Sequence, residues 1–163
     1  MSEVLMNEMC DLLPAIRFYN ETARKLMIEH EPLYLKHVEE VGFFKEDKPE
    51  MMWSDYFKIE DMGRLRVFTV RDSRHNLIGY AIYFVGQNLH YSGVKLAQCD
   101  MIFIEKKYRG GTGEKFIEWI DESLKSEGVN AVVHHAKVYY DFGSMLKRQE
   151  YEHVENIYVR RLN

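Results

Sequence analysis

The spacing of apolar residues divides the chain into a helical first part and a strand-rich second part. In the first part, apolar residues recur every three or four positions. This spacing predicts a helix from either Asn7 or Asp11 to about residue 29, and a second helix over 31–41 with Pro32 near its start. A short strand is expected before them, over 3–6.

Residues 43–62 carry aromatic residues and methionines among acids and lysines, and Pro49 interrupts the run. Two interpretations remain open. The segment forms a short helix that packs its aromatic side on a sheet, or it forms the wall of a substrate pocket, because methionine and aromatic side chains suit an adaptable pocket. The sequence alone does not distinguish these interpretations.

In the second part, the apolar residues alternate with a period of two, which is typical of strands. A polar turn separates the first two strands and predicts a hairpin. A helix then joins the third strand to the fourth, which returns parallel to the third in a right-handed crossover. The expected fold class is α/β, with a mixed, mostly antiparallel central sheet and a βαβ crossover. The elements are strands over 65–71, 77–85, 94–104 and 130–135, a helix to about 125, a short helix over 139–148 and a last strand over 153–162.

The loop between the third strand and the following helix is suited to binding an anion. The first turn of a helix leaves backbone N–H groups without partners, and the helix dipole adds partial positive charge there. Glycines let a ligand approach the backbone closely, and an arginine adds a forked donor that matches a diphosphate. The residues expected to contribute are Arg109, Gly110, Gly111, Thr112, Gly113 and Lys115.

Composition and charge narrow the function classes. A chain of 163 residues with 46% hydrophobic residues predicts one globular domain over 1–163. A formal charge of -4 does not favour nucleic acid as a partner. No apolar run of about 18 residues and no basic-then-apolar leader is present, so we expect no membrane span and a cytoplasmic location. Cys10 and Cys99 are expected to be reduced, and the scattered histidines predict no metal site.

The run Tyr108-Arg-Gly-Gly111-Thr-Gly113 resembles motif A of the GCN5-related N-acetyltransferases, in which an apolar strand leads into Arg/Gln-x-x-Gly-x-Gly/Ala. The order of elements over 64–163 is similar to that of the same family. The match keeps both glycines in register and has Tyr at the first position. The P-loop and the dinucleotide-binding patterns are absent.

This resemblance implies acetyl-coenzyme A as the cosubstrate, with its pyrophosphate at the loop. It also implies that the sheet splays between the strand before the loop and the strand after the helix. The pantetheine arm then lies in the gap, and its amides bond the main chain of Ile102, Phe103 and Ile104.

The resemblance further implies that catalysis positions an amine at the thioester, while a base removes a proton from the ammonium. Asp100 is the first candidate for this base. It lies on the same face as Ile104 under period-two geometry, and apolar neighbours would raise the pKa of its carboxyl. A structural hydrogen bond, or contact with the substrate without proton transfer, is the alternative. His134 and His135 point to opposite faces near the end of their strand. Either can relay a proton near pH 7, and we take His135 as the candidate; a core or surface histidine without this role is the alternative.

The last helix departs from the family pattern. Family members often carry a tyrosine four residues before a Gly-Phe pair, and this tyrosine protonates the leaving thiolate. Here Glu150-Tyr151 falls at the Gly-Phe position, which puts Leu146 at the tyrosine position. Tyr139 and Tyr140 lie a turn or two earlier, and we take Tyr140 as the candidate acid, with water as the alternative.

The resemblance therefore implies an N-acetyltransferase that acts on a primary amine of a small molecule or a protein. A catalytically weak or inactive protein of the same fold, binding coenzyme A or a protein partner, is the alternative. Acids clustered over 29–50 suggest a cationic acceptor. A homodimer is also open, formed by the last strand with Val154, Ile157 and Val159.

Overall fold

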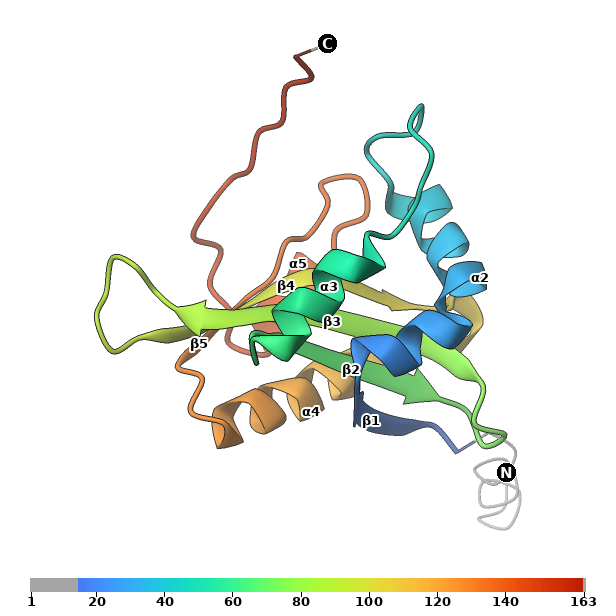
Figure 1. The fold of residues 1–163 in the computed structure, drawn as a ribbon, viewed down its shortest axis with the longest axis horizontal. Helices are drawn as coiled ribbons and strands as arrows, with labels where there is room; N and C mark the ends of the chain where they lie inside the picture. The colour runs from blue at the N-terminus through green and yellow to red at the C-terminus, as the bar shows by residue number, and fades with distance from the viewer. Residues whose placement is uncertain (1–14, 163) are drawn as a thin grey trace, which may run out of the picture.

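A five-stranded sheet organises the part of the chain that the computed structural model describes, residues 15–162 (Figure 1). The spatial order of the strands follows the sequence. Strands β1 to β4 pair antiparallel, and β5 pairs parallel to β4. This topology confirms the predicted mixed, mostly antiparallel sheet with its crossover. The strands are β1 (Arg17–Glu21), β2 (Leu65–Arg71), β3 (Leu77–Gln87), β4 (Lys95–Ile104) and β5 (Ala131–Val133).

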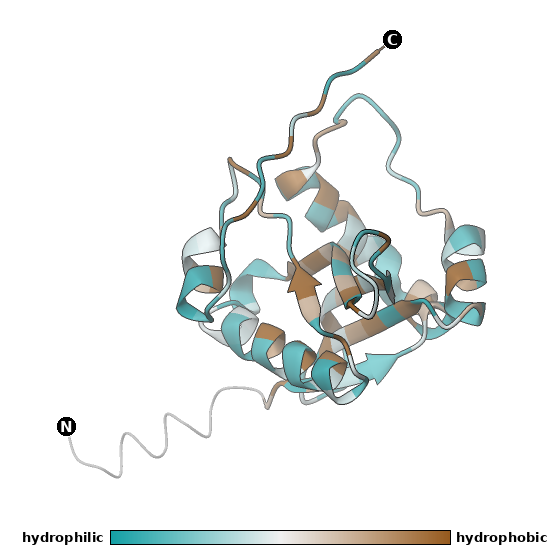
Figure 2. Cartoon of the chain, turned by 90° about the vertical axis from the view of Figure 1, so that its left-hand side faces the viewer, coloured by the Kyte–Doolittle hydropathy of each residue, from teal (hydrophilic) through white to brown (hydrophobic). Residues whose placement is uncertain are grey.

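Helices cover both faces of the sheet (Figure 1). On one face, α2 (Ala23–Val41) and α3 (Trp53–Asp61) pack on a cluster that contains Tyr80 and Phe103. On the other face, α4 (Thr112–Ser126) packs on a cluster that contains Tyr83. A 3-10 helix, η1 (Lys106–Tyr108), precedes α4, and the short α5 (Gly143–Arg148) follows β5. Figure 2 shows apolar positions concentrated in the strands, while the outer faces of the helices are hydrophilic.

The first predicted helix is wrong over 17–21, because these residues form strand β1. They pair with β2 from Arg17 opposite Arg71 to Glu21 opposite Val67. The partner strand lies about 50 residues later, so local spacing carries no signal for the pairing. The start of that predicted helix and the strand over 3–6 lie outside the described residues.

The predicted break near Pro32 is also wrong, because α2 runs through this residue. The hydroxyl of Thr22 caps its start by accepting the N–H of Lys25 at 3.1 Å. Proline removes one N–H, which would otherwise bond the carbonyl of Ile28. Ile28 is 78% exposed, so water can reach that carbonyl in place of the missing donor.

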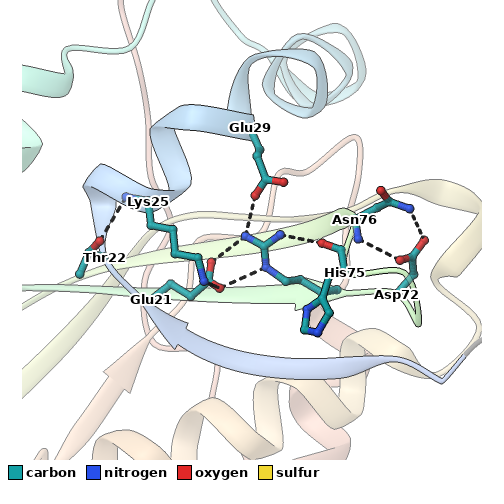
Figure 3. A network of polar contacts seen from close by, with 8 residues as sticks. Glu21, Thr22, Lys25, Glu29, Asp72, His75 and Asn76 are labelled. Atoms are coloured by element: carbon teal, nitrogen blue, oxygen red, sulfur yellow. Dashed lines mark hydrogen bonds and ion pairs between the residues drawn. The ribbon is translucent and has the colours of Figure 1, made fainter.

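Arg71 joins β1, α2 and the turn between β2 and β3. Figure 3 shows its partners Glu21, Glu29 and His75 gathered around one guanidinium group. Its side chain is 5% exposed, and its guanidinium donates to Glu21 at 3.1 and 2.9 Å and to Glu29 at 2.7 Å. A further N–H donates to the carbonyl of His75 at 2.8 Å. Removing the guanidinium would leave the carboxylate of Glu21 buried without its main partner, at a cost of about 3–5 kcal/mol.

The C-terminal region differs from its predicted elements. Strand β5 occupies only 131–133 of the predicted 130–135, and α5 occupies only 143–148 of the predicted 139–148. The predicted strand over 153–162 is wrong as an element of this chain's own sheet, because no pairing is found there. We call residues 152–162 the C-terminal arm. Among the helices described, none has the length and apolar character needed to cross a membrane.

Candidate functional site

The parallel ladder between β4 and β5 ends early and leaves a gap beside β4. Pairing stops at Gln98 opposite Val133, although β4 continues to Ile104. From Cys99 onward, β4 therefore has β3 on one side and, within residues 15–162, no strand on the other. The splayed sheet that the resemblance implied is present in this structure.

The main chain of β4 offers alternate residues to this gap. The N–H of Glu105 donates to the carbonyl of Ile78 in β3 at 2.8 Å. Backbone groups of an antiparallel strand point alternately to its two sides, so the peptide groups of Ile102 and Ile104 face the gap. Phe103, the third residue expected to contact a pantetheine arm, directs its peptide groups to β3 and lies opposite Tyr80.

A β-bulge at Asp100 changes the side-chain alternation along β4. Tyr83 of β3 pairs with Cys99, and the adjacent Ile82 pairs with Met101, so Asp100 has no partner in β3. Before the bulge, Cys99 packs on the α4 face; after it, Ile104 packs there too. Asp100 faces α3 instead. The expectation that Asp100 and Ile104 share a face is therefore wrong, because the extra residue shifts the alternation by one position.

The glycine loop presents backbone donors at the start of α4. Gly111 lies just before the helix with φ 89°, in the left-handed region that favours glycine. Within the described residues, no acceptor is found for the N–H groups of Gly110, Gly111, Gly113 and Glu114. A Cβ built at Gly110 would meet no atom within 4 Å. This open cradle, at the positive end of a helix dipole, fits a diphosphate.

The other two residues expected at the loop have different surroundings. Thr112 is the first residue of α4, and its N–H donates to the carbonyl of Arg109 at 2.6 Å, so this N–H is already used within the loop. Lys115 is exposed on the first turn of α4, where its charge adds to the positive potential of the cradle.

Arg109 connects several elements through its guanidinium. It forms a two-pronged ion pair with Glu40 at 2.6 and 2.8 Å, and Nε donates to the carbonyl of Ile104 at 2.8 Å. It also donates to the hydroxyl of Tyr140. The fork expected to bind a diphosphate is thus held by Glu40 near the end of α2, and direct phosphate binding by Arg109 stays a prediction.

Asp100 accepts a hydrogen bond from Tyr56 of α3, with 2.6 Å between the two oxygens. The pKa of its carboxyl is raised by desolvation, although the hydrogen bond from Tyr56 and the nearby His135 act in the opposite direction. The side chain keeps contact with solvent. A carboxylate with a raised pKa and access to water has the properties of a general base.

The two neighbouring histidines face opposite ways, as expected. His135 is exposed and accepts from the amide nitrogen of Gln98 at 3.1 Å, on the face of β4 that carries Asp100. His134 is hydrogen-bonded to the hydroxyl of Tyr83 at 3.2 Å, in the cluster under α4. Burial lowers the pKa of His134 to about 4, with a smaller contribution from His135. His134 is thus neutral near pH 7 and faces away from Asp100.

The structure brings two of the three catalytic candidates together. Asp100 and His135 lie on one face of β4, close enough for the imidazole to lower the carboxyl pKa. Tyr140 lies instead at the glycine loop with Arg109, and it precedes α5 rather than lying on it. Leu146, at the position where the family tyrosine was expected, is 8% exposed and packs in the interior.

The interpretation of α3 as a helix that packs its aromatic side on the sheet is confirmed, since Trp53, Tyr56 and Phe57 all contact the cluster below it. One observation supports the second interpretation, in which this segment forms the wall of a substrate pocket: the hydroxyl of Tyr56 donates to Asp100. Four of the seven acids over 29–50 form ion pairs within the chain. Ion pairs join Glu29 to Arg71, Glu40 to Arg109, Asp47 to Arg161 and Glu50 to Lys48.

Two hollows lie beside η1, just before the glycine loop. One, of about 370 Å³, is lined by Lys36, Glu40, Phe103, Glu105, Lys106 and Lys107. The other, of about 430 Å³, is lined by Asp72, Ser73, Arg74, Asn76, Lys107 and Tyr108. Asp100 and His135 line neither hollow. The candidate site is therefore identified by its backbone N–H donors and its side chains, and not by a cavity. Across 15–162, no three His, Cys, Asp or Glu side chains gather as a metal site.

Sequence reasoning missed Tyr56 and Glu40 as members of the site. Each is more than 40 residues away from its partner along the chain, and neither belongs to a motif. The one available signal was the aromatic content of 43–62, which pointed to the right segment and to no particular residue.

No family model matches the sequence, and no curated protein sequence matches it. Several solved structures share its fold. A ribosomal-protein-alanine N-acetyltransferase from Brucella melitensis biovar Abortus 2308 superposes with a TM-score of 0.67 at 17% identity, over 91% of this chain and 100% of that one. A glucosamine-6-phosphate N-acetyltransferase from Arabidopsis thaliana gives a TM-score of 0.70 at 9% identity, over 91% and 99%.

A third similar structure is an aminoglycoside acetyltransferase from an uncultured soil metagenomic sample, in complex with trehalose. Its TM-score is 0.66 at 16% identity, over 90% of this chain and 96% of that chain. At these identities the likeness concerns the fold, and it extends over nearly the whole length of each chain.

Proposed function

We propose that this chain, which has the fold of the GCN5-related N-acetyltransferases, transfers an acetyl group from acetyl-coenzyme A to a primary amine. One observation carries the proposal: the gap beside β4 leads directly to the start of α4, where four backbone N–H groups have no acceptor among the described residues. A glycine turn that served only to connect a strand to a helix would not require a splayed sheet beside it.

Different groups of this chain bind different parts of the cosubstrate. The N–H groups of the cradle bind the pyrophosphate, and Lys115 adds positive charge. The peptide groups of Ile102 and Ile104 bond the amides of the pantetheine arm. Acetyl-coenzyme A supplies the activated acyl group as a thioester.

Asp100 acts as the base in this proposal. A primary amine has a pKa of about 10 and is mostly protonated at neutral pH, so it must lose a proton before it attacks. The raised pKa of the Asp100 carboxyl strengthens it as a proton acceptor. His135 extends the path to solvent, because it is exposed and lies on the same face of β4.

The bulge contributes to catalysis through the main chain. It releases backbone groups of β4 from the β3 ladder at Asp100, beside the gap. A fixed N–H at this place polarises the thioester carbonyl and stabilises the oxyanion. The leaving thiolate takes its proton from water, because Tyr140 lies at the glycine loop, where the pyrophosphate binds, and the buried Leu146 carries no acidic proton.

Calorimetric titration with acetyl-coenzyme A and coenzyme A tests the cosubstrate site. Gly110→Asp places a carboxylate at the cradle without a steric clash, because a Cβ there meets no atom within 4 Å. Ser126→Asp adds the same charge at the other end of α4, about 20 Å away at 1.5 Å per residue. We expect micromolar binding that Gly110→Asp weakens at least tenfold and Ser126→Asp leaves unchanged.

A screen of primary amines, following thiol release, tests the reaction. We expect turnover with at least one amine and a loss of about 100-fold in kcat for Asp100→Asn. Binding without turnover across a broad panel would instead favour the alternative, a coenzyme A-binding protein of weak or no activity. Absence of binding by the folded protein would overturn the cosubstrate site itself.

A further inference from the structure

The C-terminal arm, residues 152–162, exposes many apolar side chains to solvent. Both views show the chain leaving the body and running out to its end (Figures 1 and 2). The exposed fractions are 76% for Val154, 61% for Ile157, 91% for Tyr158, 57% for Val159 and 89% for Leu162. Such a concentration of apolar side chains on one exposed segment indicates a surface that another molecule covers.

The sequence of the arm is that of a strand with apolar residues on both faces. Under period-two geometry, Val154, Tyr158 and Leu162 share one face. Ile157 and Val159 share the other. Strands with apolar residues on both sides are typical of a sheet interior, where each face is covered. The arm therefore carries the pattern of an inner strand, yet it pairs with no strand among residues 15–162.

Strand β5 offers an open edge. It pairs with β4 on one side, and the structure as described shows no hydrogen bond from the backbone of 131–133 to any other segment. The loop that continues β5 also exposes apolar side chains, with Val138 at 94% and Tyr139 at 54%. An unpaired edge with apolar neighbours is a template for an added strand.

In the described residues, the arm does not pair with the β5 edge of its own chain. Tyr151, just before the arm, donates to Asp121 of α4 at 2.8 Å, and its N–H donates to the carbonyl of Leu146. Glu150 has φ 64°, so the chain turns sharply there. These contacts fix the direction in which the arm leaves the body. Along the arm, the described polar contacts are those of Arg161 with Asp47.

We propose that two copies of this protein exchange their C-terminal arms, so that each arm adds a strand to the β5 edge of the other copy. A two-fold axis makes the two contacts equivalent, because every copy supplies one arm and one edge. At about 3.3 Å per residue, an extended arm is long enough to cover β5 and the loop after it. The proposal rests on the arm and the edge alone and is independent of the acetyl transfer proposed above.

Size-exclusion chromatography with light scattering tests the assembly on the full chain. We expect a dimer at micromolar concentration and a monomer when the chain ends at Tyr151. Ile157→Lys combined with Val159→Lys should also give a folded monomer. His153→Lys combined with Asn156→Lys adds the same number of lysines at polar positions of the arm and should leave the dimer intact. A monomeric full chain, or a dimer that persists without the arm, would overturn the proposal.

Photo-crosslinking identifies the surface that the arm occupies. A benzoyl-phenylalanine at Tyr158, in a mixture of ¹⁵N-labelled and unlabelled protein, should crosslink to peptides that contain 131–140. Because the arms belong to the other copy, labelled–unlabelled crosslinks should form. Crosslinks found only within one copy, or only to surfaces away from β5, would contradict the exchange.

Discussion

At the scale of single residues, the arrangement at Asp100 combines two opposing influences on one carboxyl group. Desolvation raises the pKa, while the hydroxyl of Tyr56 stabilises the charged form by donating to it. The hydrogen bond also holds the carboxylate in place. Tyr56 is therefore a positioning residue for the proposed base.

Replacing Tyr56 by Phe should move the pH dependence of acetyl transfer. The change removes a donor that lowers the pKa of Asp100, so this pKa should rise further in Tyr56→Phe. The base would then be protonated at a higher pH. We expect the acidic limb of the kcat/KM profile to shift upward by about 0.5–1 pH unit, which equals about 0.7–1.4 kcal/mol and lies within the net contribution of a typical hydrogen bond.

Tyr34→Phe is the matched control for this measurement. Burial raises the pKa of Tyr34, and the nearby Asp100 carboxylate raises it further, yet the structure gives Tyr34 no hydrogen bond to that carboxylate. Its replacement should leave the profile unchanged. An unchanged profile in Tyr56→Phe, with activity intact, would mean that Asp100 is not the group that titrates.

Part of this site was accessible from the sequence. The apolar neighbours of Asp100 correctly predicted a raised pKa, because desolvation follows from adjacent residues. The partner Tyr56 lies 44 residues away on another element and could not be found from spacing. The bulge was equally invisible, since it depends on how β3 and β4 pair.

At the scale of elements, α2 carries two buried histidines beneath its apolar face. His30 is 1% exposed and lies with its ring 4.3 Å from that of Tyr80, while His37 is bonded to the Tyr80 hydroxyl at 2.6 Å. Burial lowers the pKa of each to about 4. In the unfolded chain their pKa is about 6.5, so the unfolded state binds more protons between these values.

The stability contributed by the neutral histidines is therefore present above pH 6.5 and is lost as the pH falls toward 4. For one such histidine, lowering the pH from 7.5 to 5.5 should reduce the free energy of unfolding by about 1.4 kcal/mol. His30→Phe should remove the contribution of His30 to the pH dependence of the free energy of unfolding. The phenyl ring fits this site, because the aromatic side chains of Tyr34, Trp53 and Tyr80 surround it.

Urea unfolding at the two pH values measures this effect. His90→Phe serves as the control, because His90 is exposed and should leave the pH dependence as it is in the wild type. An equal loss of stability on acidification in wild type and His30→Phe would show that His30 is not neutral in the folded protein.

The end of α2 is also joined to the glycine loop through Glu40 and Arg109. Glu40→Gln removes a negative charge beside an anion site and frees the guanidinium for a phosphate. We expect the affinity for coenzyme A to rise about three- to tenfold by calorimetry, in keeping with one charge at a partly solvated site. Glu39→Gln on the exposed side should have no effect, and weaker binding by Glu40→Gln would contradict a competing role for Glu40.

The elements themselves were predictable to different degrees. Strands β2 to β4 and helix α4 were placed well, because each has a strong period and clear turn residues at its ends. Strand β1 was missed because its stabilisation comes from β2, far along the chain. The arm was expected to be a strand from its alternation, and no other strand in the part of the chain that the structure describes pairs with it.

At the scale of the whole molecule, arm exchange would couple folding to protein concentration. Association stabilises the folded state by mass action, so the melting temperature should rise with concentration. Between 1 and 100 µM we expect an increase of about 3–5 °C, which corresponds to about 1.4 kcal/mol per chain. Scanning calorimetry on the full chain and on the chain ending at Tyr151 measures this, and a melting temperature independent of concentration in both would count against exchange.

The overall topology could be inferred because the order of elements and the glycine motif constrain it together. The order of strands and the crossover were correct, and the splay between β4 and β5 followed from the resemblance alone. The ion pairs that join distant elements were not predictable, among them Arg71 with Glu21 and Arg109 with Glu40. Such contacts depend on the final packing of surfaces that no local pattern specifies.

The bulge at Asp100 also determines how this strand must be aligned with others. One extra residue reverses the inward and outward positions for the rest of β4, so the strand is equivalent to a regular strand plus a one-residue insertion. An ungapped alignment of β4 with a strand that lacks the bulge would match buried positions with exposed ones on one side of Asp100. A gap placed at Asp100 keeps Cys99 and Ile104 together as neighbours of α4 and compares each side chain with its true structural counterpart.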